Sequence, residues 1–308
     1  MNKKFLMGVG VGVMAVTALE VFNKVINEYS KKYVINRTTG YYFTWTEGSI
    51  HYNVVGKGKP ILLIHDLNVL ASEYEWKNIV DDLSENHTVY TLDLLGCGLS
   101  DKPDITYTTF TFVQIISAFV NEVIKEKCDV ITSNNSSDIV IMAQKIYDVF
   151  DKMILINPTK IDTNPMVTNR IRLIRKKVLY TPILGTLLYN RIVNQIKIKA
   201  TINFNLYNKM DANLLSEACY EASHINNSKG RYLYASMKCS YVSCDVRQAL
   251  SEQSNIYIII GTELSNVNVE DYQKINSDIN VKTIAGSKML PHFENPEDTY
   301  RAIYQILK

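Results

Sequence analysis

The sequence predicts an α/β protein in which a mostly parallel sheet is flanked by helices. Two observations carry this prediction. Residues 61–93 read as strand, helix and strand joined by short links, and residues 129–149 read as strand, sharp turn and helix. Such crossovers join neighbouring parallel strands and are almost always right-handed. The chain has 308 residues, 46% apolar and 21% charged, which is enough for one large domain with an insertion or for two domains.

The first 28 residues are expected to form a hydrophobic anchor helix. Two lysines precede an uncharged run over 5–19, and the apolar pattern continues to Ile26, which is long enough to cross a bilayer. A signal peptide cleaved after residues 16–18 is the alternative. A buried helix of the globular domain is the third, although Gly8, Gly10 and Gly12 would weaken a helix in water. Five cysteines without a C-x-x-C pair favour reduced thiols over export. We therefore expect a membrane-anchored protein with a cytoplasmic globular domain, and a secreted protein as the alternative.

The globular part begins with strands separated by turns, over 41–45 and 50–55. The next run, 61–64, has no polar alternation and is predicted to be a central parallel strand buried on both faces. A helix with Trp76 and Leu83 on its apolar face follows. The strand over 88–92 then ends at Asp93.

Two motifs lie at the ends of these strands. The first reads Leu62-Leu-Ile-His65, and the second reads Asp93-Leu-Leu-Gly96-Cys-Gly98-Leu-Ser100-Asp-Lys102-Pro103. They resemble the strand-HG loop and the D-x-x-G-x-G-x-S-x-K-P segment of the α/β-hydrolase superfamily. The resemblance covers about 41–158 and 255–307. It implies an α/β-hydrolase fold with an inserted helical cap and the hydrolysis of an ester or similar bond.

One departure from the family concerns the oxyanion hole, which this resemblance assigns to His65, Asp66, Leu67 and Asn135. The family's HG becomes His65-Asp66, so a carboxylate replaces a glycine. An anion beside a site that stabilises an anion should hinder it.

The nucleophile position is the second departure. An α/β-hydrolase carries its serine in a G-x-S-x-G turn between strand and helix. In Asp129-Val-Ile-Thr-Ser-Asn-Asn-Ser-Ser-Asp-Ile-Val140, the best register places Thr132 and Ser136 in the small positions and Asn134 at the serine. A slip by one residue would offer Ser133, but Ile131 would then occupy a position that needs a small residue.

The acid and the base also depart from the family. The G-x-x-D turn reads Gly261-Thr-Glu-Leu264, so Leu264 stands at the acid, with Glu263 adjacent as a possible substitute. The H-x-P-H-x-E-x-P segment reads Met289-Leu-Pro-His-Phe-Glu-Asn-Pro296, so Met289 stands at the base. His292 lies three residues further on, and we expect it to be structural. Asparagine, leucine and methionine cannot move a proton at neutral pH.

The expected organisation is an anchor over 1–28, a hydrolase core over 29–158 and 253–308, and a helical cap over 159–252. The basic run over 170–177 is expected to be the solvated face of a cap helix, with contact to anionic lipid as the alternative.

We therefore expect a catalytically inactive α/β-hydrolase-fold protein that binds a small apolar ligand or a protein partner beneath its cap. The first alternative is an active serine hydrolase that uses Ser133 or Ser136 with His292 and Glu263. The second is an enzyme of another type, such as a lyase, that needs no nucleophile. The sequence has no phosphate-binding loop or metal-ligand spacing, so we expect no cofactor or metal. The net charge of +2 disfavours nucleic acid as a partner.

Overall fold

The computed structural model describes residues 3–161, 168–264 and 269–308. These residues contain an eight-stranded sheet in the order β1-β2-β4-β3-β5-β6-β7-β8. β2 pairs antiparallel with β1 and β4, and all other neighbours are parallel. The predicted fold class is therefore confirmed. The strands are β1 (Tyr41–Trp45), β2 (Gly48–Gly56), β3 (Lys59–Ile64), β4 (His87–Leu92), β5 (Cys128–Ser133), β6 (Phe150–Ile156), β7 (Ile256–Gly261) and β8 (Asn280–Ile284).

Strand β3 is the buried centre of the sheet, as its unbroken apolar run predicts. It lies between β4 and β5, parallel to both. Leu62 and Ile64 pack into the hydrophobic core on one face, and Ile61 and Leu63 pack into the core on the other. All four side chains are fully buried, so both faces of this strand are covered.

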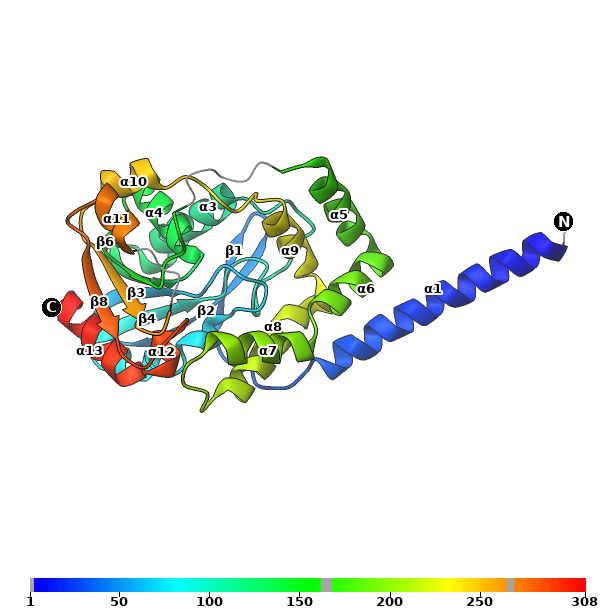
Figure 1. Cartoon of the computed structure of the whole chain (residues 1–308), viewed down its shortest axis with the longest axis horizontal. Coiled ribbons are helices and arrows are strands. Elements are labelled where there is room, and N and C mark those ends of the chain that lie inside the picture. The colour runs from blue at the N-terminus through cyan, green and yellow to red at the C-terminus, as the bar shows by residue number, and fades with distance from the viewer. Residues whose placement is uncertain (1–2, 162–167, 265–268) are drawn as a thin grey trace.

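Helices cover both faces of the sheet (Figure 1). α3 and α4 pack on one face, where Phe112 and Phe119 are buried, and α2 and α13 pack on the other around Leu83 and Ile303. The helices are α1 (Lys3–Tyr29), η1 (Glu73–Trp76), α2 (Val80–Ser84), α3 (Thr109–Phe119), η2 (Val120–Ile124), α4 (Ser136–Tyr147), α5 (Arg170–Tyr180), α6 (Pro182–Ile192), α7 (Gln195–Asn205), α8 (Ala212–Ser228), α9 (Arg231–Lys238), α10 (Arg247–Ser251), α11 (Val269–Ile275), α12 (Pro291–Glu294) and α13 (Pro296–Leu307).

Of the described helices between β6 and β7, α5 to α9 are called here the inserted helices. They share a core that includes Leu179, Tyr189 and Leu215, and this core extends to Leu290 and Phe293 of the sheet domain. α10 packs instead against α4 and α11. The domain boundaries at 158 and 252 remain predictions, although the inserted helices end before α10.

Helix α1 projects away from the rest of the molecule, and only its C-terminal end packs, against α6 and α8 (Figure 1). Asn23 Nδ2 donates to the Ile183 carbonyl over 3.1 Å, and Asn190 Nδ2 donates to Asn23 Oδ1 over 3.2 Å. The segment after α1 is fixed by Glu221, whose carboxylate accepts the main-chain N–H of Val34 over 2.9 Å. Among the described residues, no helix combines the length and the apolar character needed to cross a membrane. The membrane anchor therefore remains a prediction.

Candidate functional site

The turn between β5 and α4 has the conformation expected of a nucleophile elbow. Asn134 stands at its apex with a φ of +47°, in the left-handed region that asparagine tolerates better than most residues. Its main-chain N–H donates to the Ile156 carbonyl over 2.9 Å, which ties the turn to β6. The Asn134 side chain is 95% buried, and its Nδ2 has no hydrogen-bond partner among the described residues. Asn134 thus stands at the apex of the turn, the position that the resemblance assigns to the nucleophile.

The two serines beside Asn134 hold other partners. Ser133 Oγ donates to Glu75 Oε1 over 2.5 Å, and Ser136 Oγ donates to the His65 carbonyl over 2.5 Å. Both serines are fully buried. Neither hydroxyl is paired with an imidazole, the group that would have to take its proton.

The Asp66 carboxylate binds the main-chain amide of Asn135, one of the groups that the resemblance assigns to the oxyanion hole. Its Oδ1 accepts the main-chain N–H of Asn135 over 3.0 Å and the Asn135 side-chain amide over 2.8 Å. Burial, and then repulsion from the Glu75 carboxylate, raise the pKa of Asp66 to about 6. At neutral pH this site therefore holds a negative charge supplied by the chain itself.

Glu75 is the centre of a buried polar group. Besides the Ser133 hydroxyl, it accepts the main-chain N–H of Asp66 at Oε2 over 3.3 Å. His292 Nε2 lies 3.6 Å from Glu75 Oε1, and the imidazole stacks on Trp76 with ring centroids 4.1 Å apart. Neither ring nitrogen of His292 has a hydrogen-bond partner among the described residues. The carboxylate thus lies between hydroxyl and imidazole, whereas a triad has the imidazole in the middle.

The resemblance assigns the acid position to Leu264 and the base position to Met289. Leu264 is half-buried after β7, and the neighbouring Glu263 is exposed, with its main-chain N–H bonded to the Ser287 carbonyl over 3.0 Å. Met289 lines the cavity beside Asn134. The structure therefore does not bring Glu263 together with Ser133, Ser136 or His292.

Two side chains hold the Met289 loop in place. Asn157, directly after β6, donates from Nδ2 to the carbonyls of Lys288 over 2.7 Å and Met289 over 2.9 Å. Glu294 Oε1 accepts the N–H groups of Lys288 over 2.9 Å and Leu290 over 3.0 Å, and its Oε2 binds the inserted segment at the N–H of Tyr207. Hydrogen bonds from Asn157 and to Glu294 thus fix the main chain of the loop that carries Met289.

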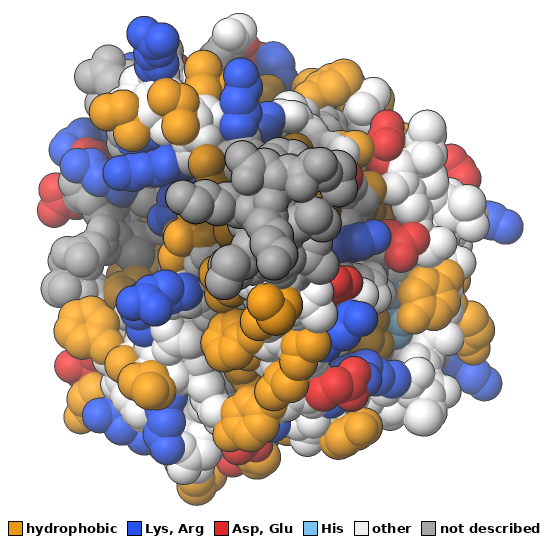
Figure 2. Space-filling view, turned by 90° about the vertical axis from the view of Figure 1, so that its right-hand side faces the viewer, with side chains coloured by type: hydrophobic (Ala, Val, Ile, Leu, Met, Phe, Trp, Pro, Cys, Tyr) orange, Lys and Arg blue, Asp and Glu red, His pale blue; other side chains and the backbone are white. Residues whose placement is uncertain are grey.

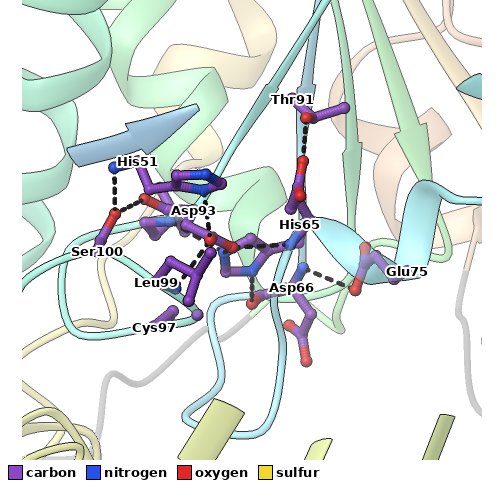
Figure 3. Close-up of polar contacts among 12 residues, drawn as sticks. His51, His65, Asp66, Glu75, Thr91, Asp93, Cys97, Leu99 and Ser100 are labelled. Carbon is purple, nitrogen blue, oxygen red and sulfur yellow. Dashed lines mark hydrogen bonds and ion pairs between the residues drawn. The ribbon is translucent and has the colours of Figure 1, made fainter. Parts of the chain in front are cut away.

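Asp93 organises the glycine-rich loop after β4 (Figure 3). Its Oδ2 contacts His51 Nδ1 over 3.0 Å and accepts the N–H of Leu99 over 2.9 Å. A Cβ on Gly98 would lie 2.1 Å from Asp93 Oδ1, so any other residue there would displace the Asp93 carboxylate. His65 Nε2 accepts the N–H of Leu94 over 3.0 Å, so the ring proton lies on Nδ1, which donates to the Asp66 carbonyl over 2.7 Å. Leu67, the residue after Asp66, is buried. These contacts set the loop geometry around Asp66.

A cavity of about 80 Å³ lies between these loops and the inserted helices. Asp66, Glu75 and Asn134 line one part of it, called here the floor, and Asn68, Ser72, Thr201 and Asn205 add further polar groups to the lining. Its other walls are mostly apolar and include Leu206, Leu215, Ala218, Cys219, Met289 and Leu290. A groove of about 400 Å³ between α7 and α9 shares Asn68, Leu70 and Thr201 with the cavity. Within the described ranges, no three His, Cys, Asp or Glu side chains are grouped as a metal site would need.

Sequence reasoning missed two residues of this site, Glu75 and Asn157. Glu75 precedes Trp76 in a segment predicted to be one helix with Trp76 and Leu83 on its apolar face. The structure forms the 3₁₀ turn η1 and the separate short helix α2 there instead, and both Glu75 and Trp76 are buried in η1. No sequence signal marks it. Asn157 could have been found, because polar residues that directly follow parallel strands meet at one edge of the sheet.

The comparisons with known proteins agree with this architecture. No family model matches the chain. Over 70 residues, the chain is 37% identical to 2-hydroxy-6-oxo-6-(2'-aminophenyl)hexa-2,4-dienoic acid hydrolase of Metapseudomonas resinovorans, a stretch covering 22% of this chain and 24% of that protein. The matched stretches span about a quarter of the length of the curated relatives.

Solved structures match over much more of the chain. A serine hydrolase involved in carbazole degradation superposes with a TM-score of 0.70 at 16% identity, over 87% of this chain and 98% of its own. A membrane phospholipase A, described as a bacterial virulence factor, superposes with a TM-score of 0.67 at 16% identity, over 99% of this chain and 98% of its own. With the mostly parallel eight-stranded sheet and the elbow between β5 and α4, these likenesses show that the chain has the α/β-hydrolase fold.

Proposed function

We propose that this protein is a catalytically inactive member of its fold that binds a small, mainly apolar ligand beneath the inserted helices, which act as a cap. The observation that carries the proposal is the contact between the Asp66 carboxylate and the Asn135 main-chain N–H. In a hydrolase of this fold, the amide after the nucleophile stabilises the oxyanion. Here a carboxylate already holds that amide and would repel a second negative charge.

The residues at the reaction centre support the same conclusion. Asn134 offers an amide instead of a hydroxyl, and Met289 offers a thioether instead of an imidazole. Loss of a triad member leaves only the residual rate enhancement of binding and oxyanion donors, roughly 10³–10⁴ over water. Because the Asp66 carboxylate also accepts the Asn135 main-chain N–H, which would otherwise stabilise an oxyanion, even this remaining activity should be small.

The lining of the cavity supports one class of ligand for this proposal. Its walls favour an apolar body, and the groove between α7 and α9 gives room for an extension lined by Ile192, Val193 and Met237. The carboxylates of Asp66 and Glu75 at the floor accept hydrogen bonds, so the buried end of the ligand should donate one. Asn134 Nδ2 has no partner among the described residues and can donate, so an alcohol head, which both donates and accepts, or an amine head fits this floor better than a carboxylate head, which Asp66 and Glu75 would repel.

A fluorophosphonate probe tests the absence of catalysis. The purified, folded protein should not be labelled and should not hydrolyse simple acyl esters above the buffer rate. Ser133→Ala and Ser136→Ala are the control variants. Labelling of the parent protein that disappears in either variant would refute the proposal.

Thermal unfolding in the presence of ligands tests the binding class separately. Octanol and octylamine should raise the Tm, octanoate should not, and Asp66→Asn should reduce the difference between octylamine and octanoate. Stronger stabilisation by octanoate than by octylamine would contradict the assignment of the cavity floor, whatever the labelling result.

An active hydrolase is the second candidate. It is favoured by the hydrolase names of the matched proteins and by the 2.5 Å contact between Ser133 Oγ and Glu75 Oε1, which places a possible proton acceptor beside a hydroxyl. Ser133 is fully buried and would have to move to meet a substrate.

Membrane attachment through α1 is a further part of the proposal. Support comes from the membrane phospholipase A, whose superposition covers 99% of this chain and so extends into α1, whereas the carbazole-pathway hydrolase covers 87%. Cell fractionation of the full chain, compared with a chain that begins at residue 30, is the direct measurement. Recovery of the full chain in the soluble fraction would contradict this part.

A further inference from the structure

The inserted helices carry a strong separation of charge. Residues 168–210 contain nine Lys and Arg and no Asp or Glu, whereas the whole chain has a net charge of +2. The rest of the chain is therefore net acidic. We propose that the face formed by α5, α6 and the packed end of α1 docks onto an anionic lipid surface. This face is called here the basic face.

Helix α5 has an unusual outward side. Ile171, Ile174 and Val178 follow the i, i+3, i+7 spacing of a single helix face and are exposed by 61%, 53% and 40%. Arg170, Arg175 and Lys177 are also exposed on this helix. A helix that turns aliphatic and basic side chains together toward solvent has the composition of one that lies in a membrane interface.

The neighbouring elements continue the basic face. α5 packs against α6 and α9, and α6 packs against α1. Leu184 of α6 and Phe22 and Val25 of α1 are exposed. Hydrophobic and basic side chains gather on the side of the molecule from which α1 projects (Figure 2). The aliphatic residues of α5 thus belong to a surface shared by three helices.

A groove of about 460 Å³ between α5, α6 and α9 gives this face a place for a headgroup. Arg172, Arg175, Lys176 and Lys238 line it, together with Leu179, Leu188 and Ile192. Cationic side chains beside an apolar wall suit a lipid phosphate with its first acyl carbons. Nucleic acid would use the cations, but its phosphodiester backbone would gain nothing from the exposed isoleucines.

Vesicle flotation of the full chain tests the electrostatic part. Binding to vesicles of phosphatidylcholine with about 30% phosphatidylglycerol should exceed binding to pure phosphatidylcholine and should fall with added salt. Arg170→Glu/Arg175→Glu/Lys177→Glu should weaken binding to the anionic vesicles by about 100-fold or more, since each basic residue near such a surface contributes roughly fivefold.

The matched control is Lys57→Glu/Lys125→Glu/Lys308→Glu, which makes the same charge change at exposed sites of the sheet domain. This control should bind the anionic vesicles more tightly than the α5 variant. Equal binding of the two variants would overturn the proposal.

A fluorophore on α5 tests contact independently of how α1 binds. Ile174→Cys, labelled with an environment-sensitive dye in a Cys244→Ser background, should show a blue-shifted emission that lipid-borne quenchers suppress on anionic vesicles. Lys57→Cys, labelled in the same way, should report water. A dye at 174 that stays in water on vesicles that have bound the protein would overturn the proposal, and so would a blue shift obtained with RNA and not with anionic vesicles.

Discussion

The Asp66 carboxylate accepts two hydrogen bonds from Asn135, one from its main-chain N–H and one from its side-chain amide. These residues are 69 positions apart, so the contact joins the loop after β3 to the start of α4. Asp66 is 95% buried and has Glu75 beside it, which explains why the pKa of Asp66 rises to about 6. The two hydrogen bonds occupy the Asn135 amide and favour the ionised carboxylate, but burial and the Glu75 charge outweigh them and destabilise the ionised folded state.

Asp66→Asn should stabilise the fold at neutral pH. The native pKa of about 6 exceeds the ordinary value of 3.8, so between these values the folded state holds a proton that the unfolded state has released. Stability due to this group falls as the pH rises through that window. Two pKa units correspond to about 3 kcal/mol, and solvent relaxation makes this an upper bound. Asparagine keeps an acceptor for the Asn135 N–H without the charge.

Urea unfolding of parent and variant at several pH values measures this effect. The gain in free energy of unfolding should be close to zero near about pH 4 and should reach about 2–3 kcal/mol at about pH 7.5. The difference between the two proteins cancels the titration of carboxylates that do not interact with residue 66. A gain that does not change with pH would contradict the assignment of the raised pKa to Asp66.

Rebuilding the reaction centre should require several residues together. Asn134→Ser alone restores a hydroxyl without a base, so a fluorophosphonate should not label it. Asn134→Ser combined with Met289→His, Leu264→Asp and Asp66→Gly supplies base, acid and a free oxyanion amide and should be labelled at residue 134. Mass spectrometry of the labelled peptide identifies the site, and circular dichroism confirms folding. Equal labelling of the single variant would show that Met289 and Asp66 do not limit the chemistry.

The sequence was sufficient to predict the sheet, because its strands depend on local patterns. β3 was predictable from four consecutive aliphatic residues, and the turn at Asn134 from small polar residues between an apolar strand and an apolar helix. The assignment of Asp66 to an oxyanion loop stays a prediction, although the structure places Asp66 in the loop directly after β3.

The partners of these residues were not predictable. The contact of Asp66 with Asn135 depends on how two distant loops pack, and the inward direction of Glu75 depends on a single 3₁₀ turn. His292 was expected to be structural, and the structure places it on Trp76, a residue 216 positions away. Sequence spacing contains no such information, because these contacts follow from the completed packing of the sheet, its loops and its helices.

Gly98→Ala should destabilise the protein far more than Gly286→Ala. Both glycines have positive φ, +42° and +63°, so both substitutions incur a backbone cost of about 1–2 kcal/mol. At Gly98 the new Cβ would also meet the Asp93 carboxylate at 2.1 Å, whereas at Gly286 the nearest atom lies 3.8 Å away. We expect a loss above about 3 kcal/mol for Gly98→Ala and about 1 kcal/mol for Gly286→Ala in chemical unfolding. Equal losses would mean that the Asp93 loop can move to accept a methyl group.

Ser133→Ala and Ser136→Ala compare two buried hydroxyls that each donate one 2.5 Å hydrogen bond. Ser133 donates to Glu75, whose two oxygens both accept hydrogen bonds, whereas Ser136 donates to a neutral carbonyl. Removing the donor from a buried carboxylate should cost about 2–3 kcal/mol, and removing it from a carbonyl about 1 kcal/mol. Urea unfolding of both variants measures the difference.

Glu75→Gln/Ser133→Ala serves as the double variant. A neutral amide at residue 75 should reduce the loss in free energy of unfolding that follows from removing the Ser133 hydroxyl. If Ser133→Ala costs no more than Ser136→Ala, Glu75 does not depend on this hydroxyl, and the buried polar group beneath Asn134 is held by its other contacts.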